Sequence, residues 1–169
     1  LGEVTEEKAV DLVAMAVGRA REIEALATQT YVPKRDALVV GGGIAGMTAA
    51  LSIADQGFDV HLVEKTDSLG GNIVNVKRTV EGYDPAVLLK KTEDKIRQNQ
   101  HITVYKNSTV AECKGFSGDF KTKINVGNDK DQPHTVEIEH GAAILATGAG
   151  ESQPTEYLYG DNDKIFTQL

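Results

Sequence analysis

The sequence predicts an α/β fold: a Rossmann-like βαβ parallel sheet with an antiparallel β-meander as crossover, preceded in the sequence by an N-terminal helix. Three observations predict this fold. Residues 36–65 follow the order apolar run, glycine-rich turn, helix-like segment, apolar run. Residues 109–139 contain β-rich stretches separated by Gly, Ser, Asn, Asp and Pro. Residues 141–148 form an apolar run ending in a small, turn-forming triplet, as expected of a strand that rejoins a parallel sheet.

The first predicted element is an amphipathic helix over residues 5–27. Thr5 can cap its start, and the two glutamates that follow suit the positive end of the helix dipole. Apolar side chains recur at helical spacing, at Val10, Val13, Val17 and Ala20. Such a stripe usually packs on its own domain or on a neighbouring one. Residues 28–35, which include Pro33, are predicted to link this helix to the first strand.

The most specific motif follows the first predicted strand. Residues 37–40 are apolar, and they lead into Gly41-x-Gly43-x-x-Gly46 at the start of a helix-like segment. The first glycine permits a tight turn, the second lets the backbone approach a pyrophosphate, and the third lets the helix pack closely on the strand. The diphosphate would lie on free N–H groups at the helix start, which Ile44 and Ala45 supply.

An acidic residue ends the second predicted strand. Glu64 lies 18 residues after Gly46, where its carboxylate can accept hydrogen bonds from both hydroxyls of an adenosine ribose. This placement favours an unphosphorylated ribose, and therefore FAD or NAD over NADP. Lys65 could lie over the adenine, and it fits a solvated surface lysine at least as well. Strand, helix, strand and acid in register predict dinucleotide binding. The alternative is a purely structural turn.

Two later segments extend the candidate site. Gly70, Gly71 and Asn72 follow Leu69 just past the ribose-binding acid, and paired glycines are typical of a loop whose backbone approaches a ligand or of a plain turn. The Asn72 amide can donate or accept toward a cofactor. Ala146, Thr147 and Gly148 end a predicted strand, at the edge where α/β sheets place ligands.

The remaining elements connect these segments. Asp84 offers an N-cap followed by proline at the first helical position, and Leu88, Leu89, Thr92 and Ile96 give a helical face to about Gln98. Residues 102–105 are the next short strand. Residues 109–114, 120–126 and 135–139 are the three strands of the predicted meander.

Taken together, these motifs resemble the FAD domain of the two-dinucleotide-binding-domain flavoproteins, the glutathione reductase-like group. In that group the Ala-Thr-Gly turn lies beside the flavin. The resemblance narrows to the A subunit of heterodisulfide reductase, and three stretches carry it: KAVDLVAMAVGRA, then GGGIAGMTAALSIADQGFDVHLVEK-x₃-LGGN, then LATGA-x-E-x-x-P-T-E-Y-x-Y-G over residues 145–160.

This resemblance implies an FAD-dependent, anaerobic electron-transfer oxidoreductase related to methanogenesis. In the family a longer polypeptide adds ferredoxin-type iron–sulfur clusters and works with other subunits and an electron-donating partner. The single cysteine here, Cys113, cannot hold a cluster that needs four. Any cluster would therefore belong to a longer parent protein.

The predicted organisation is a helix and linker over residues 1–35, a partial FAD-binding domain over 36–150, and a connection toward a missing C-terminal part over 151–169. The chain lacks an initial methionine, so we expect a piece of a longer protein, inactive alone. Two alternatives stay open. One is an FAD/NAD-dependent flavoprotein reductase or oxidase of the wider group, and the other is a cofactor-free structural docking module.

The composition argues against several classes of binding partner. Of 169 residues, 40% are hydrophobic and 25% charged, which is ordinary for a globular protein. The net charge of -7 argues against nucleic acid or an anionic membrane surface as the main partner. Since no apolar run reaches the roughly 20 residues of a membrane span, we expect a cytoplasmic protein. The four histidines lack metal-ligand spacing and are predicted at the surface or at strand edges, so no metal site and no catalytic residue is predicted.

Overall fold

The computed structural model describes residues 5–25, 30–127 and 134–167. The chain divides into two compact units, Leu1–Tyr31 and Val32–Leu169. Helix α1, Glu6–Glu22, lies in the first unit, and Thr5 occupies its N-cap position as predicted. The Thr5 side chain makes no capping hydrogen bond to the described helix. The predicted end at residue 27 is wrong, because the backbone becomes extended at Ile23 (φ -76°, ψ 114°); residues 26 and 27 lie outside the described part.

The apolar side of α1 is exposed within its own unit. No residue of the described helix is buried. The exposed fractions of the Val10, Val13 and Val17 side chains are 63%, 64% and 47%. The helix therefore gains nothing from burial inside residues 5–25, and its favourable charges, acidic in the first turn and basic in the last, act on the helix dipole instead.

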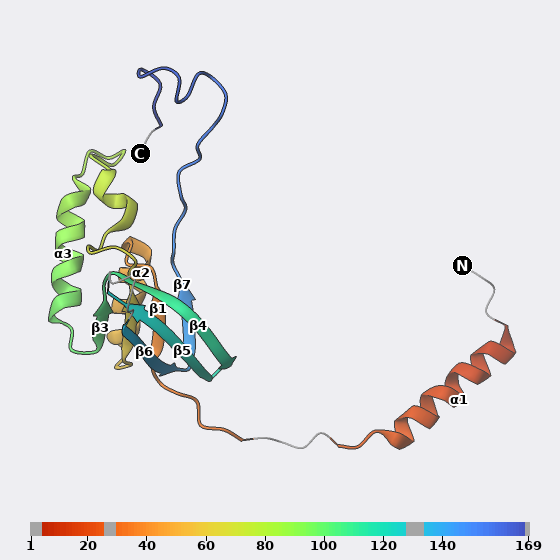
Figure 1. The fold of residues 1–169 in the computed structure, drawn as a ribbon. Coiled ribbons are helices and arrows are strands. Elements are labelled where there is room, and N and C mark those ends of the chain that lie inside the picture. The colour runs from red at the N-terminus through yellow and green to blue at the C-terminus, as the bar shows by residue number, and fades with distance from the viewer. Residues whose placement is uncertain (1–4, 26–29, 128–133, 168–169) are drawn as a thin grey trace. The chain divides into compact units, whose positions relative to one another are not determined.

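The second unit combines a parallel and an antiparallel sheet (Figure 1). The parallel sheet has the order β3-β2-β1-β7, with strands β1 Ala37–Val40, β2 Val60–Val63, β3 Ile102–Tyr105 and β7 Ala142–Leu145. The antiparallel sheet has the order β4-β5-β6, with strands β4 Ser108–Phe116, β5 Asp119–Val126 and β6 His134–His140. The helical elements are α2 Ile44–Ala54, the 3₁₀ helix η1 Gly71–Asn75 and α3 Pro85–Gln98. The predicted α/β fold with a meander crossover between β3 and β7 is confirmed.

The core forms on both faces of the parallel sheet because side chains alternate along each strand. On the helical face, Val39 and Leu62 pack with apolar residues of α2 and α3, among them Met47, Ala50 and Ile96. On the meander face, Leu38 and Val63 pack with Ile124 and Ile138. Burial on both faces explains why β1 reads as a continuous apolar run rather than an alternating one.

Helix α3 begins as its sequence predicts. Asp84 is the N-cap, its side chain accepts a hydrogen bond from the Ala86 N–H at 2.9 Å, and proline follows at the first helical position. Thr92 and Ile96 are buried. Leu88, also on the predicted helical face, is 51% exposed. Leu89, one residue on, packs against the core instead.

The histidine prediction fails at one position. His140 ends β6 and is fully buried, with an exposed fraction of 0%. Its Nδ1 lies 2.9 Å from the Ala142 carbonyl, which can only accept, so Nδ1 carries the hydrogen and Nε2 accepts from the Thr122 hydroxyl at 2.8 Å. Burial lowers the pKa of His140, which keeps the imidazole neutral. The strand end is therefore a hydrogen-bonded part of the interior rather than a surface edge.

Thr122→Val is expected to lower the free energy of unfolding by about 1–3 kcal/mol, because it leaves the buried Nε2 of His140 without a donor while preserving side-chain shape. Denaturant unfolding measures this change. The matched control is Thr135→Val on β6, where the hydroxyl is exposed and donates to Asn125 at 3.2 Å; the expected change is within about 0.5 kcal/mol. Equal effects of the two substitutions would contradict a structural role for the Thr122–His140 bond.

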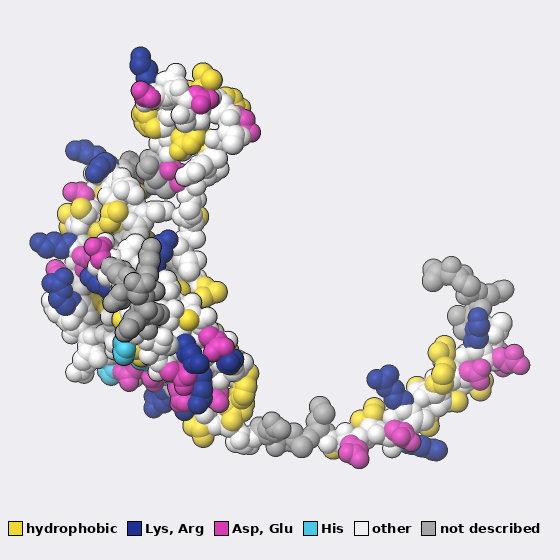
Figure 2. Space-filling view, viewed as in Figure 1, with side chains coloured by type: hydrophobic (Ala, Val, Ile, Leu, Met, Phe, Trp, Pro, Cys, Tyr) yellow, Lys and Arg dark blue, Asp and Glu magenta, His cyan; other side chains and the backbone are white. Residues whose placement is uncertain are grey.

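Ion pairs join the linker to the meander. Glu139 on β6 pairs with Lys34 and with Lys121, and Figure 2 shows basic and acidic side chains interleaved on this part of the surface. Hydrogen bonds from these two lysines, together with their charges, lower the pKa of Glu139 to about 2. The Lys34 N–H also donates to the Gly118 carbonyl at 2.8 Å, so the segment before β1 is fixed to the meander through both backbone and side chain.

Candidate functional site

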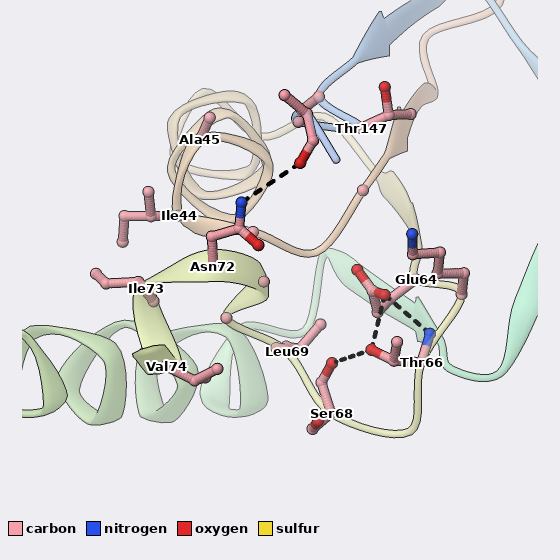
Figure 3. A pocket seen from close by; sticks show the side chains of 18 of the residues that line it. Ile44, Ala45, Glu64, Thr66, Ser68, Leu69, Asn72, Ile73, Val74 and Thr147 are labelled. Carbon is pink, nitrogen blue, oxygen red and sulfur yellow. Dashed lines mark hydrogen bonds between the residues drawn. The ribbon is translucent and has the colours of Figure 1, made fainter. Parts of the chain in front are cut away.

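A cavity of about 550 Å³ opens at the carboxyl ends of β1, β2 and β7 (Figure 3). Its walls come from the β1–α2 turn, the loop after β2 that runs into η1, and the residues after β7. In an open α/β sheet this edge is where ligands bind, because loops and helix N-termini converge there. The cavity lies wholly within the second unit.

The cavity brings together residues that the sequence analysis selected from three separate segments. Twelve of the thirteen predicted positions line it: Gly41, Gly43, Ile44, Ala45, Glu64, Lys65, Gly70, Gly71, Asn72, Ala146, Thr147 and Gly148. The exception is Gly46, which is buried in α2 behind the cavity wall. Lining residues that were not predicted include Thr66, Asp67, Ser68, Ile73, Val74 and Ala149. Each of them adjoins a predicted segment in sequence, and that adjacency was the available signal.

Two glycines let three backbone segments meet behind the cavity. Gly41 has φ +110°, and a Cβ there would lie 2.3 Å from the Ala146 carbonyl oxygen. A Cβ at Gly46 would lie 1.8 Å from the Gly41 carbonyl oxygen. The end of β1 therefore lies directly between the start of α2 and the end of β7. This is the close packing that the first and third glycines of the motif predict.

Gly43 faces the cavity rather than the protein. It is the N-cap of α2 with extended backbone (φ -71°), and a Cβ there would find no described atom closer than the Gly70 carbonyl oxygen at 3.9 Å. The first helical hydrogen bond runs from the Met47 N–H to the Gly43 carbonyl at 2.9 Å. The N–H groups of the turn before it, including those of Ile44 and Ala45, are therefore outside the helical ladder. They form the positive end of the α2 dipole at the cavity wall.

The loop after β2 lies against the glycine-rich turn. Gly70 donates its N–H to the Gly42 carbonyl at 2.8 Å and forms a parallel bridge with Gly43. A Cβ at Gly71 would lie 3.3 Å from the Gly43 Cα, and both Gly70 and Gly71 have positive φ. Positive φ favours glycine at both positions, and the close approach to the Gly43 backbone favours it further at Gly71.

Glu64 is held by the protein on both of its carboxylate oxygens. Its side chain is buried, with an exposed fraction of 7%. Oε2 accepts from the Gly42 N–H at 2.6 Å, and Oε1 lies 2.8 Å from both the N–H and the hydroxyl oxygen of Thr66. Figure 3 shows the pair of bonds between Glu64 and Thr66. The carboxylate is therefore fixed in position at the cavity wall.

These contacts also set the ionisation of Glu64. Burial raises its pKa, but the hydrogen bonds from Thr66 and Gly42 and the nearby charge of Lys65 outweigh burial, so the pKa lies below its ordinary value. The anion is the form present near neutral pH. Because the folded-state pKa is depressed, the stabilisation from these bonds is complete above the unfolded pKa and is lost as pH falls through the folded value.

Gly42 is a site residue that the sequence analysis missed. A Cβ at this position would lie 2.9 Å from Glu64 Oε2 and 2.5 Å from a terminal carbon of Leu69. Only a glycine allows its N–H to reach the carboxylate so closely. The available signal was the run of three glycines from Gly41 to Gly43, of which the motif explains the first and the last.

The far side of the cavity is formed by the residues that follow β7. The Asn72 amide nitrogen donates to the Ala149 carbonyl at 3.4 Å, a long contact that joins η1 to this segment. Thr147 and Gly148 are exposed. Within the described residues, no group of three or more His, Cys, Asp or Glu side chains could hold a metal ion. The described part of the chain also contains no helix that is long and apolar enough to span a membrane.

A family model described as pyridine nucleotide-disulphide oxidoreductase matches residues 35–168. The chain belongs to this family. The match begins just before β1 and includes every lining residue of the cavity, so the family assignment and the site concern the same part of the molecule. Family membership makes this unit an oxidoreductase domain, in agreement with the fold prediction.

Within the family, the chain is similar to the A subunits of heterodisulfide reductases. It is 42% identical over 120 residues to the second of the iron-sulfur A subunits of CoB-CoM heterodisulfide reductase in Methanopyrus kandleri, covering 70% of this chain and 18% of that protein. It is 36% identical over 150 residues to the A subunit of H(2):CoB-CoM heterodisulfide,ferredoxin reductase in Methanothermobacter marburgensis, covering 88% of this chain and 21% of that protein. The chain therefore spans about a fifth of the length of these relatives, and the predicted resemblance is confirmed.

Solved structures agree on the fold. L-proline dehydrogenase from P. horikoshii matches 71% of this chain and 24% of its own with a TM-score of 0.57 and 23% identity. A putative thioredoxin reductase from Bacillus anthracis matches 71% of this chain and 38% of its own with a TM-score of 0.51 and 21% identity. At these identities the likeness concerns the fold of the family.

Proposed function

We propose that the second unit binds FAD, with the adenosine diphosphate half of the cofactor in the cavity at the carboxyl ends of β1, β2 and β7. One observation carries this proposal: the helix start at Gly43 and the fixed carboxylate of Glu64 open onto the same cavity. A nucleoside diphosphate needs an anion site beside a ribose acceptor, and these two groups supply both. A Cβ at Gly43 would have the Gly70 carbonyl oxygen, 3.9 Å away, as its nearest described neighbour, so the backbone there is open to the approach of a phosphate.

Each predicted residue then has a place along the cofactor. The diphosphate lies on the N–H groups of Ile44 and Ala45, and the ribose donates a hydrogen bond to the Glu64 carboxylate. Lys65 lies over the adenine. The remaining lining positions are directed toward the flavin end: Gly70, Gly71, Asn72, Ala146, Thr147 and Gly148. Gly41 and Gly46 act through packing, because the close backbone contacts at these two glycines shape the turn.

FAD, when bound, supplies the redox chemistry by accepting or releasing a hydride or single electrons. The residues of this chain bind and orient the cofactor, and none acts as a catalytic acid or base. Glu64 contributes as an anion, which its lowered pKa maintains near neutral pH. The positive end of α2 offsets the charge of the diphosphate.

The wider proposal is an electron-transfer oxidoreductase similar to the A subunit of heterodisulfide reductase. The relatives carry that name; one of the names includes the words iron-sulfur, and another includes ferredoxin reductase. We propose that the flavin exchanges electrons with iron–sulfur clusters outside residues 1–169 and that the protein works in the cytoplasm with other subunits and an electron donor. Residues 36–150 form the adenosine-diphosphate half of the domain, and residues 151–169 lead toward its remainder.

Glu64→Ala is expected to weaken binding of both ADP and FAD by about 30-fold, which corresponds to about 2 kcal/mol for hydrogen bonds to a charged group. Calorimetric titration of the 169-residue chain with ADP, FAD and NAD measures this effect. The matched control is Glu156→Ala, which removes the same charge from an exposed position outside the cavity and is expected to leave the affinities unchanged.

Unfolding measurements on Glu64→Ala separate lost binding from lost structure, since the substitution also removes the acceptor of the Gly42 and Thr66 N–H groups. Saturable binding of NAD with none of FAD would contradict the choice of cofactor. Failure of ADP and FAD to bind the folded wild-type chain would overturn the proposal and favour the structural docking module.

A further inference from the structure

The acceptor sites of Glu64 are unequally occupied. A carboxylate oxygen has two lone pairs and can accept about two hydrogen bonds. Oε1 has two protein partners, the N–H and the hydroxyl oxygen of Thr66, both at 2.8 Å. Oε2 has one described partner, the Gly42 N–H at 2.6 Å. One acceptor position therefore stays open on Oε2, while the positions on Oε1 are filled.

The Thr66 hydroxyl occupies one acceptor position of Glu64 Oε1 whichever way its hydrogen points. The hydroxyl oxygen lies 2.8 Å from Glu64 Oε1 and also 2.8 Å from the Ser68 carbonyl oxygen, and its single hydrogen serves one acceptor at a time. In either orientation the oxygen atom lies beside Oε1. A second hydroxyl, from a ligand, cannot take the same position.

From this geometry we propose that Thr66 is a specificity-determining residue that restricts Glu64 to one ribose hydroxyl, accepted by Oε2. This inference rests on the proposed binding of an adenosine diphosphate group in the cavity. It differs from the sequence-based expectation that Glu64 accepts from both hydroxyls. Thr66 acts through Glu64, and the loop from Thr66 to Ser68 keeps its hydroxyl in place.

The neighbouring contacts support a fixed arrangement. Glu64 is 7% exposed, and its backbone is held on both sides, with its N–H donating to the Tyr105 carbonyl at 2.8 Å and its carbonyl accepting from the Ser108 N–H at 2.9 Å. The carboxylate cannot rotate to offer Oε1 without breaking its bond to the Gly42 N–H. A fixed acceptor of this kind discriminates between ligands, because a ligand that lacks the matching hydroxyl leaves the acceptor without a hydrogen bond.

A ligand series tests the proposal. ADP, 2′-deoxy-ADP and 3′-deoxy-ADP are titrated into the wild-type chain and into Thr66→Ala and Thr66→Ser. In the wild type, loss of one of the two hydroxyls is expected to weaken binding about 10-fold, and loss of the other less than about 2-fold. Thr66→Ala removes the oxygen beside Oε1, so both deoxy analogues are expected to bind about 10-fold more weakly than ADP. Thr66→Ser retains the hydroxyl and should keep the wild-type pattern.

The outcomes separate the inference from the function on which it rests. Absence of ADP binding to the folded wild type overturns the proposed function. If ADP binds and both hydroxyls, or neither, contribute in the wild type, the one-hydroxyl restriction is wrong. If Thr66→Ala keeps the wild-type pattern, the restriction does not come from Thr66. Because each comparison is made between ligands on the same variant, a general loss of stability would weaken all three ligands and leave their ratios unchanged.

Discussion

Replacing Gly46 with alanine is expected to lower the free energy of unfolding by about 3 kcal/mol or more. The new methyl carbon would lie 1.8 Å from the Gly41 carbonyl oxygen, which is a backbone atom and cannot rotate away. Gly41 is in turn confined, because its own Cα faces the Ala146 carbonyl. Relief therefore requires α2 to move away from both β1 and β7. Since a domain of this size has a free energy of unfolding of about 5–15 kcal/mol, the substitution would remove a large fraction of it.

Denaturant unfolding followed by circular dichroism measures this effect, and two substitutions control for it. Ser52→Ala changes an exposed residue of the same helix and should alter stability by less than about 0.5 kcal/mol. Gly43→Ala introduces the same methyl group three residues earlier, where the nearest described atom would be 3.9 Å away. If Gly46→Ala were as stable as Gly43→Ala, the close packing of α2 on the β1 turn would be refuted.

The fold was predictable because its signals are local. The βαβ unit combines an apolar strand, a glycine motif at the helix start and a second apolar strand within residues 36–65, and each part restricts the backbone independently. The meander was predictable for the same reason, since turn residues separate its strands. Return of the chain to β7 beside β1 then follows from the meander acting as the crossover.

What the sequence did not predict depends on contacts between distant segments. Gly42 and Glu64 are 22 residues apart, and their bond exists only because β1 and β2 are paired in register, with Val40 beside Val63. His140 is buried because β6 ends against the parallel sheet, and nothing local in its sequence distinguishes it from the exposed His134. Hydrogen-bond partners across strands are properties of the packed layers rather than of sequence patterns.

Gly43→Ala is expected to weaken binding of ADP and FAD by about 100-fold, or about 2.7 kcal/mol, with little change in stability. The backbone at Gly43 has φ -71°, which alanine adopts without strain, and the methyl would project where the protein leaves space beside the cavity. That space is where the diphosphate must approach the helix start. The same titrations measure the affinities. Gly18→Ala, on α1 with no described atom within 4 Å of the new methyl, is the matched control and should bind as the wild type does.

A shorter ligand identifies which half of the site the Gly43 methyl obstructs. Adenosine has the ribose but no phosphate, so Gly43→Ala should bind it as the wild type does, whereas Glu64→Ala should weaken adenosine and ADP alike. Equal weakening of adenosine and ADP by Gly43→Ala would mean that the methyl disturbs the whole cavity. Unchanged ADP binding by Gly43→Ala would place the diphosphate away from the α2 N-terminus. Weakening of ADP alone by Gly43→Ala, together with weakening of both ligands by Glu64→Ala, would locate the phosphate at Gly43 and the ribose at Glu64.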